Sequence, residues 1–279
     1  MKSEVKPTRI GPIQYVRSAV GLLWQYRRFI LGSVEREFRS RYTRTIFGAL
    51  WLLLAPFAMI VVYTIVFSQV MHARLPGSDA PYAYSIFLCA GLLPWQWFTE
   101  LLSRNVSIFV DHAGLIRKSN FPRLVLPVIA FISSACNFAL VAGLFLIFLL
   151  FMGRWPGWNI LGFIPLLLLQ SAFAMGLGVA LGVLNVFFRD VSQTVGIVLQ
   201  FWFWLTPIIY ATPTLPAGVR DYLAWNPVFP LFQAYQQILM GQGLPQWCSL
   251  LGLCGLTALS LLLALWIYLA AQSQLVDEL

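Results

Sequence analysis

The sequence predicts an all-α membrane protein with six transmembrane helices. Of its 279 residues, 59% are hydrophobic and only 10% are charged, and charge-free runs of 20 to 55 residues recur along the chain. A soluble domain carries about 25% charged residues, so no single water-soluble core would bury this much apolar surface. Because a helix needs about 20 apolar residues to cross the hydrocarbon layer, lipid is the expected solvent for most of this chain.

The six spans are expected near residues 48–71, 84–103, 124–152, 160–186, 193–211 and 248–270. Lipid offers no hydrogen bonds to a bare backbone, so spanning segments must be helices or a closed barrel. The runs are much longer than barrel strands and do not alternate apolar with polar residues, which favours helices. The domain organisation that follows is a cytoplasmic segment, a membrane domain and a short cytoplasmic tail, over residues 1–46, 47–272 and 273–279.

The distribution of lysine and arginine predicts the orientation. With the N-terminus in the cytoplasm, fifteen of the eighteen Lys and Arg residues lie inside, and only Arg74, Arg154 and Arg220 lie outside. This is the asymmetry of the positive-inside rule. Both termini are therefore predicted to be cytoplasmic, and the stretch LIRKSNFPR, residues 115–123, links the second and third spans on that side. The net charge of +8 is assigned to membrane orientation rather than to nucleic-acid binding.

Residues 20–46 are expected to form an amphipathic helix along the membrane surface. Apolar residues recur there every three or four positions, which is the helical period. They are Leu23, Tyr26, Ile30, Val34, Phe38 and Tyr42. Arg27, Glu37 and Arg41 fall near this apolar stripe and Gly32 interrupts it, so a solvated linker remains the alternative.

Residues 211–246, between the fifth and sixth spans, are expected on the outer side. The segment is uncharged except for Arg220 and Asp221, and Pro227 and Pro230 forbid one continuous helix. Residues 231–240 are long enough for a short one. An apolar segment too short to cross the membrane is typical of a re-entrant or interfacial hairpin. This outer hairpin is predicted to lie at the mouth of a pore, and Pro207 just before it is expected to kink the fifth span.

The chain offers few groups for catalysis or for energy conversion. None of its three lysines follows a P-loop glycine pattern, so it has no Walker A site of its own. The four cysteines lack CxxC spacing, so neither a disulfide framework nor a metal site is expected. Asp111 and His112 form the only adjacent pair of acid–base residues, which disfavours a membrane-bound enzyme.

Ionisable residues are almost absent from the predicted spans, unlike those of ion-driven carriers. Glu100, near the cytoplasmic end of the second span, is the nearest case, and Arg104 four residues later predicts a local ion pair. The chain is therefore predicted to be a non-enzymatic conduit driven by a separate energy source.

Six motifs occur in order: RYTRTIFGALWLLLAPFAM at 41–59, AGLLPWQWF at 90–98, LIRKSNFPRLVLP at 115–127, FFRDVSQ at 187–193, LTPIIY at 205–210 and WNP at 225–227. Together they resemble the membrane subunit, or permease, of ABC-2-type polysaccharide exporters, a group that includes O-antigen, capsule and teichoic-acid exporters. The resemblance covers residues from about 20 to 275. The RTIFGALW and FPRLVLP stretches resemble the O-antigen and teichoic-acid members more closely.

The resemblance implies a homodimer bound to two ABC ATPase subunits in the bacterial inner membrane. It also implies a polysaccharide substrate carried on a polyprenyl diphosphate, with ATP and Mg on the partner subunit and no cofactor on this chain. The same architecture exporting a drug, haem or a lipid is the alternative function.

In this family the link between the second and third spans docks on the ATPase as a short coupling helix, and residues 107–120 fit that place. The expected coupling residues are Asp111, Leu115, Ile116, Arg117, Lys118, Asn120 and Phe121, with Arg189 and Asp190 as a smaller second contact at the next cytoplasmic turn. Pro122 suits the first turn of the third span. The alternative for the cations of this link is that they only set the orientation of the chain in the membrane. For Arg189 and Asp190, the alternative is a local ion pair or a helix cap.

Three arginines precede the first span: Arg39, Arg41 and Arg44. They are predicted to attract the carrier diphosphate at the cytoplasmic entrance, because the planar guanidinium fork matches phosphate. Orientation together with anionic lipid head groups is the alternative.

Aromatic side chains are predicted to line the glycan channel, because a flat ring can lie against the C–H face of a sugar. The candidates are Trp95, Trp97, Trp202, Trp204 and Tyr210. An interfacial aromatic belt is the alternative.

Overall fold

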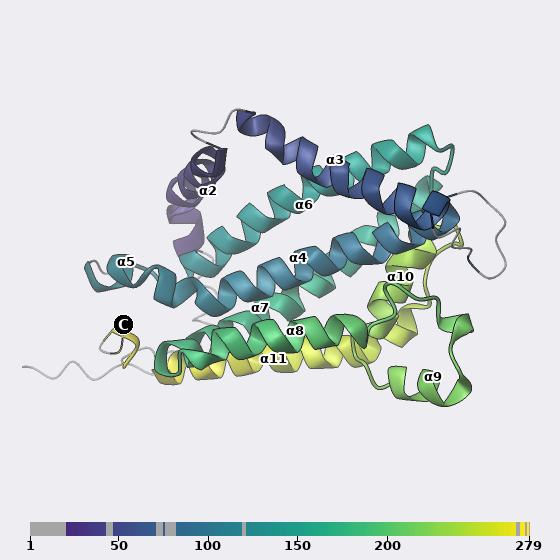
Figure 1. The fold of residues 1–279 in the computed structure, drawn as a ribbon. Helices are drawn as coiled ribbons and strands as arrows, with labels where there is room; N and C mark the ends of the chain where they lie inside the picture. Colours follow the sequence, from purple (N-terminus) through teal and green to yellow (C-terminus); the bar gives the residue numbers. More distant parts are fainter. Residues whose placement is uncertain are drawn as a thin grey trace, which may run out of the picture.

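The computed structural model describes residues 21–42, 47–70, 75, 82–118, 121–271, 274–276 and 278. Every regular element within these ranges is helical, which confirms the all-α prediction. The long helices lie side by side, and α2 crosses them at one end (Figure 1).

The bundle is built from the long helices α3 (Trp51–Thr64, continued by η2, Ile65–Val70), α4 (Ala83–Asp111), α6 (Val125–Phe151), α7 (Phe163–Phe187), α8 (Asp190–Trp204) and α11 (Leu251–Ala271). Short turns lead into three of them: η1 (Gly48–Leu50), η3 (Gly157–Gly162) and η5 (Trp247–Leu250). Three stretches within the described ranges are long and apolar enough to cross a membrane, namely Val125–Phe151, Gly157–Phe187 and Trp247–Ala271, and Leu53–Phe67 is a shorter apolar helix. The count of six spans stays a prediction.

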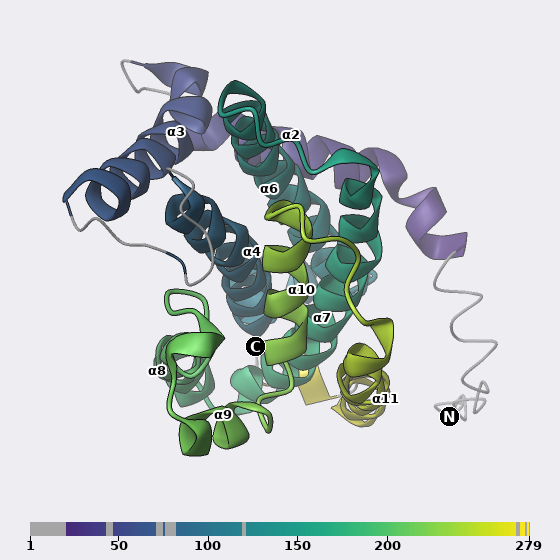
Figure 2. The same cartoon turned by 90° about the vertical axis from the view of Figure 1, so that its right-hand side faces the viewer.

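The short elements mark the two ends of the bundle. Near one end lie α2 (Arg27–Tyr42), α5 (Ala113–Lys118), the turn between α7 and α8, and the C-terminal turn η6 (Gln274–Val276) (Figure 1). At the opposite end, η4 (Thr212–Thr214) and α9 (Ala217–Leu223) lead to α10 (Phe229–Leu239), which lies across the ends of the long helices (Figure 2). The segments predicted to be cytoplasmic therefore share one end, and the predicted outer hairpin lies at the other.

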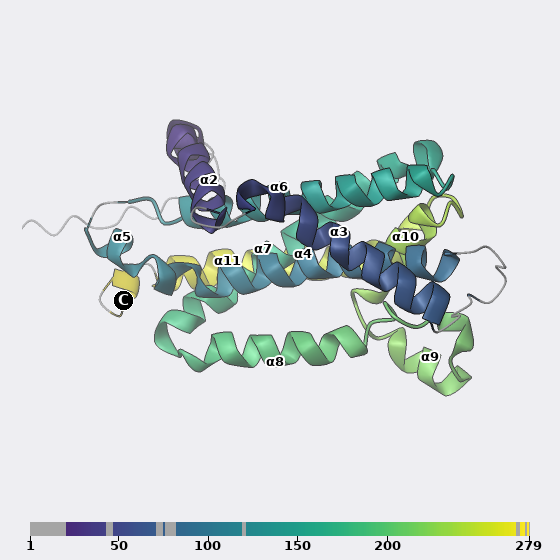
Figure 3. The same ribbon diagram turned by 45° about the horizontal axis from the view of Figure 1, so that its top comes forward.

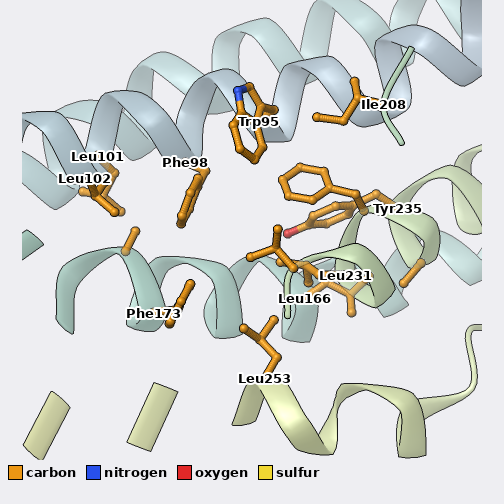
Figure 4. Close-up of a cluster of buried hydrophobic side chains, with 14 of the residues drawn as sticks. Trp95, Phe98, Leu101, Leu102, Leu166, Phe173, Ile208, Leu231, Tyr235 and Leu253 are labelled. Carbon is orange, nitrogen blue, oxygen red and sulfur yellow. The ribbon is translucent and has the colours of Figure 1, made fainter. Parts of the chain in front are cut away.

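The central helix of the bundle is α4, which enters three of the four buried apolar clusters. Its Trp95 and Phe98 pack against α7, α8 and α10, and the same cluster reaches Leu253 of α11 (Figure 4). Trp97 faces the other way, into a cluster shared with α3 and α6. Phe109, near its last turn, packs with α6, α7 and α11.

Glycines let α7 approach its two main neighbours closely. A Cβ on Gly182 would lie 2.4 Å from the backbone oxygen of Asn105 in α4, and a Cβ on Gly178 would lie 2.6 Å from the Asn105 Cβ. On another face, a Cβ on Gly176 would lie 2.4 Å from Ser260 Oγ in α11. Small residues four apart are a common device for close packing of membrane helices. The helices α4, α7 and α11 are therefore held at near-minimal separation.

The fifth predicted span differs from the prediction, because α8 ends at Trp204 and residues 205–211 form turns. Pro207 has no backbone N–H and disfavours a helical conformation in the residue before it, so it ends the helix instead of kinking it. Two backbone carbonyls of the turn after α8 accept hydrogen bonds from side chains. Gln236 Nε2 donates to Pro207 O at 3.2 Å, and the Tyr84 hydroxyl donates to Ile209 O. The shortened α8 lies along one flank of the bundle (Figure 3), with Leu199 as its only fully buried residue.

Candidate functional site

The α5 helix forms a corner between α4 and α6 at the end where α2 lies. Ile116 of α5 is only 4% exposed and packs with residues of α4, α6, α7 and α11. Leu115 and Phe121 pack against the same cluster, whereas Arg117 is exposed. The short helix thus buries an apolar side in the bundle and turns a cation outward.

The predicted coupling segment 107–120 is not one helix. Residues 107–111 are the last turn of α4, where Ser107 Oγ donates to Asp111 Oδ2 at 2.6 Å, and α5 begins only at Ala113. Asp111 is exposed. Asn120 and the side chain of Lys118 lie outside the described residues.

Phe121 joins this corner to α2. Its ring centroid lies 5.9 Å from that of Tyr26 and 5.1 Å from that of Phe29. Next to these rings, Ile30 and Val34 of α2 are buried against the first turns of α6. The described part of the predicted amphipathic segment is therefore helical, and its apolar stripe packs on α6. Its position along a membrane surface stays a prediction.

A charged network also fixes α2 to the bundle. Arg104 Nη2 of α4 lies 2.7 Å from Glu37 Oε2 of α2, and Ser133 Oγ of α6 donates to the same carboxylate oxygen at 2.7 Å. The predicted Glu100–Arg104 pair is present at 3.5 Å, and Asn137 Nδ2 donates to Glu100 at 3.2 Å. Sequence reasoning missed the role of Glu37, although its place near the apolar stripe was a signal that it faces protein.

The other predicted cations lie at the surface. Arg39 pairs with Glu35 at 3.2 Å, and both side chains are more than two-thirds exposed. The side chain of Arg41 and the whole of Arg44 lie outside the described residues. Arg189 and Asp190 are exposed at the start of α8. Asp190 occupies the first turn, where a carboxylate complements the helix dipole. The N-cap position itself is held by Arg189, without a side-chain capping hydrogen bond.

Two of the predicted channel-lining residues are covered by protein in this structure. Trp95 is 5% exposed and lies among aromatic rings of α4, α8 and α10, with the Phe232 centroid at 5.4 Å. Trp97 is also 5% exposed and stacks on Phe138 at 4.7 Å. The channel-lining prediction is therefore wrong for these two rings here, because they fill the interhelical core.

The other three predicted aromatics lie near the end of α8 that faces α9. Trp202 is half-buried and its Nε1 donates to Asn226 Oδ1 at 2.9 Å. Trp204 is 60% exposed, and the Tyr210 hydroxyl donates to its carbonyl at 2.7 Å. Of the five candidates, Trp204 has the ring most accessible for contact with a substrate, lipid or second subunit.

Asn226, which the sequence reasoning left without a role, ties this end of α8 to α10. Its Oδ1 accepts from Trp202 Nε1 at 2.9 Å and from the N–H of Val228 at 3.2 Å. Its Nδ2 donates to Leu205 O and to Thr206 Oγ1, each at 3.0 Å. One amide thus joins the last turn of α8 to the residue before α10.

Asn226→Ala is expected to destabilise the protein by about 2 kcal/mol or more, because several polar groups lose their partner together. Asn226→Asp keeps the acceptor but places a carboxylate oxygen against Leu205 O, so it should also melt below wild type. Thermal unfolding in detergent, followed by tryptophan fluorescence, measures both effects. Equal melting temperatures for all three proteins would contradict the assigned role.

Comparison with known proteins identifies the family. The ABC-2 type transporter family matches residues 30–240. The O-antigen export system permease protein RfbA of Myxococcus xanthus is 32% identical over 259 residues, which are 92% of this chain and 97% of that protein. A protein of the same name from Klebsiella pneumoniae is 28% identical over 74% of this chain and 78% of its own length. The polysialic acid transport protein KpsM of Escherichia coli is 26% identical over 84% of this chain and 89% of its own. The chain is therefore a multi-pass membrane protein that belongs to the ABC-2 type transporter family.

Proposed function

We propose that the chain is the transmembrane subunit of an ATP-driven exporter that moves a lipid-linked, O-antigen-like polysaccharide across the bacterial inner membrane. The observation that carries the proposal is the similarity, over nearly the whole chain, to proteins named as O-antigen export permeases. A separate ATPase supplies the energy, since the chain has no Walker A site. Export of a drug, haem or a lipid remains the alternative function, which no observation favours.

In this proposal, α5 receives the ATPase. Arg117 is exposed for contact, while Ile116 is buried against four long helices. A displacement of α5 would be transmitted directly to the packed core, because close-packed side chains are only slightly compressible. Phe121 would pass it on to Tyr26 and Phe29 of α2. Asp111, Arg189 and Asp190 lie exposed near the same end and would complete the contact.

The remaining assignments also belong to the proposal. Six spans, both termini in the cytoplasm and a homodimer follow from the charge asymmetry and the family. The exposed apolar flank of α8, with Ile197, Phe201 and Trp204, supports contact with lipid or a second copy. Arg39, Arg41 and Arg44 would attract the carrier diphosphate, and Trp204 with Tyr210 would contact the sugar chain.

Reversing two charges on α5 tests the coupling. We expect Arg117→Glu with Lys118→Glu to lower glycan export and ATPase recovery by about tenfold each, a loss of about 1.4 kcal/mol of binding, while membrane insertion is unchanged. The assays are surface glycan, co-purification with the ATPase, and ATP turnover with and without lipid-linked glycan.

A variant of the three arginines before the first span is the control for the α5 variant. Glutamine at Arg39, Arg41 and Arg44 should leave ATPase recovery intact and reduce the stimulation of ATP turnover by lipid-linked glycan. Normal export and normal ATPase recovery in the α5 variant would remove the coupling assignment. Absence of glycan export by the wild-type complex would remove the function itself.

A further inference from the structure

A polar cavity of about 390 Å³ lies at the α10 end of the molecule. Four glutamines line it, together with Arg220 of α9 and Phe87 of α4: Gln233, Gln236, Gln237 and Gln242. A second cavity, of about 370 Å³ between α4, α6 and α7, is lined by aliphatic and aromatic side chains and a cysteine. The glutamine cavity is thus different in kind from the apolar spaces between the helices.

The glutamines belong to one face of an amphipathic helix. Leu231, Phe232 and Tyr235 of α10 are buried in the main cluster of the bundle. Gln233, Gln236 and Gln237 recur three and four residues apart, so they share another face. The buried face holds α10 in place, and the amide face is presented to the cavity.

Gln236 is held in position with its acceptor unused. Its side chain is only 6% exposed, and its Nε2 donates to Pro207 O at 3.2 Å and Ile208 O at 3.4 Å. No described residue donates to its Oε1. Gly91 permits this approach, because a Cβ there would lie 3.0 Å from the same Nε2. An amide oxygen that accepts from no described residue, on the wall of a polar cavity, is suited to accept from a ligand hydroxyl.

Neutral amides make up most of the polar side chains that line the cavity. Among the lining residues that the structure describes, Arg220 is the only charged one, and its guanidinium donates to Leu215 O at 3.0 Å and Pro213 O at 2.7 Å. Amides supply both donors and acceptors, as the hydroxyls of a neutral sugar require. The ring of Phe87 adds an apolar surface for the C–H face of such a sugar.

We infer that this cavity is a hydroxyl-binding subsite that holds a sugar unit of the polymer at the outer end of the translocation path. The inference rests on the proposed function and deepens it. It assigns sugar contact to the amides of α10, which are distinct from the aromatic residues near the end of α8. A polymer that passes this face would exchange hydrogen bonds with a row of amides.

Thiol protection during export tests the subsite. Gln233→Cys, an exposed lining residue, is placed in a protein whose four natural cysteines are replaced by alanine. A membrane-impermeant maleimide is applied from outside to cells that assemble the lipid-linked glycan and to cells that cannot begin its synthesis. Labelling should be about fivefold slower when glycan is made, which corresponds to a site occupied about four-fifths of the time.

Gln246→Cys is the matched control, because Gln246 is exposed beyond α10 and does not line the cavity. Its labelling rate should be the same in both strains. Surface glycan is measured in the same cells, so that the test of the export function is separate from the test of the subsite. Normal export with equal Gln233→Cys labelling in both strains overturns the subsite and leaves the function standing. Failure of Gln233→Cys to label in either strain also overturns it, because the cavity would then not open outward.

Discussion

Replacing Gly182 with leucine is expected to force α4 and α7 apart and to abolish export. The added Cβ would meet the Asn105 backbone oxygen at 2.4 Å, and a backbone atom cannot rotate out of the way as a side chain can. Overpacking a core costs about 1–3 kcal/mol where side chains absorb the change, so this substitution should cost at least the upper value. The melting temperature and the monodisperse fraction of the purified protein measure the effect.

Gly143→Leu is the matched control for helix propensity and added volume, because nothing lies within 4 Å of a Cβ at Gly143 in α6. That variant should melt close to wild type. Gly182→Ala should already lower the melting temperature, since the clash arises at Cβ. Wild-type behaviour of Gly182→Leu would show that close approach of α4 and α7 does not hold the bundle together.

The second large effect is expected at Arg104. Arg104→Met removes the guanidinium that lies against the carboxylates of Glu37 and Glu100 and so joins α2 to α4. Loss of one partner of a fully buried ion pair costs about 3–5 kcal/mol, and exposed pairs contribute about 1 kcal/mol or less. The side chains here are 22% to 27% exposed, so about 1–3 kcal/mol is expected. Export should fall with it, because α2 would lose its ion pair with α4.

Hydrogen exchange of the α2 amides is the direct readout, since it reports local opening of that helix. Glu35→Gln provides the control: its pair with Arg39 has side chains 71% and 79% exposed, and its loss should change stability by less than about 0.5 kcal/mol. If α2 exchanges at the same rate in Arg104→Met as in wild type, the network is not what fixes it.

Local pattern was enough to predict the helices, because long charge-free runs and a helical period depend only on neighbouring residues. Residues 20–46 illustrate this: Ile30 and Val34 are buried as the period requires. The end of α8 could not be read from Pro207 alone, because Pro94 lies inside the uninterrupted α4.

Contacts between distant segments could not be predicted in the same way. Trp95 and Trp97 lie on either side of Gln96 in α4, and their identity alone does not reveal whether each ring meets protein or a channel. The Glu37–Arg104 pair joins residues 67 positions apart. The glutamine cavity likewise depends on how α10 folds back across α4, which no single stretch of sequence encodes.

The uninterrupted course of α4 has a mechanical consequence. Its 29 residues span about 43 Å at 1.5 Å per residue, from the glutamine cavity to the α5 corner. Its one internal proline, Pro94, is braced by Gln170, whose Nε2 donates to the proline carbonyl at 2.9 Å. A stiff rod of that length converts a tilt of about 5° at one tip into a displacement of about 4 Å at the other. Under the proposed function, ATP hydrolysis by the partner subunit on one side of the bilayer would open or close a passage on the far side through the tilt of this one helix.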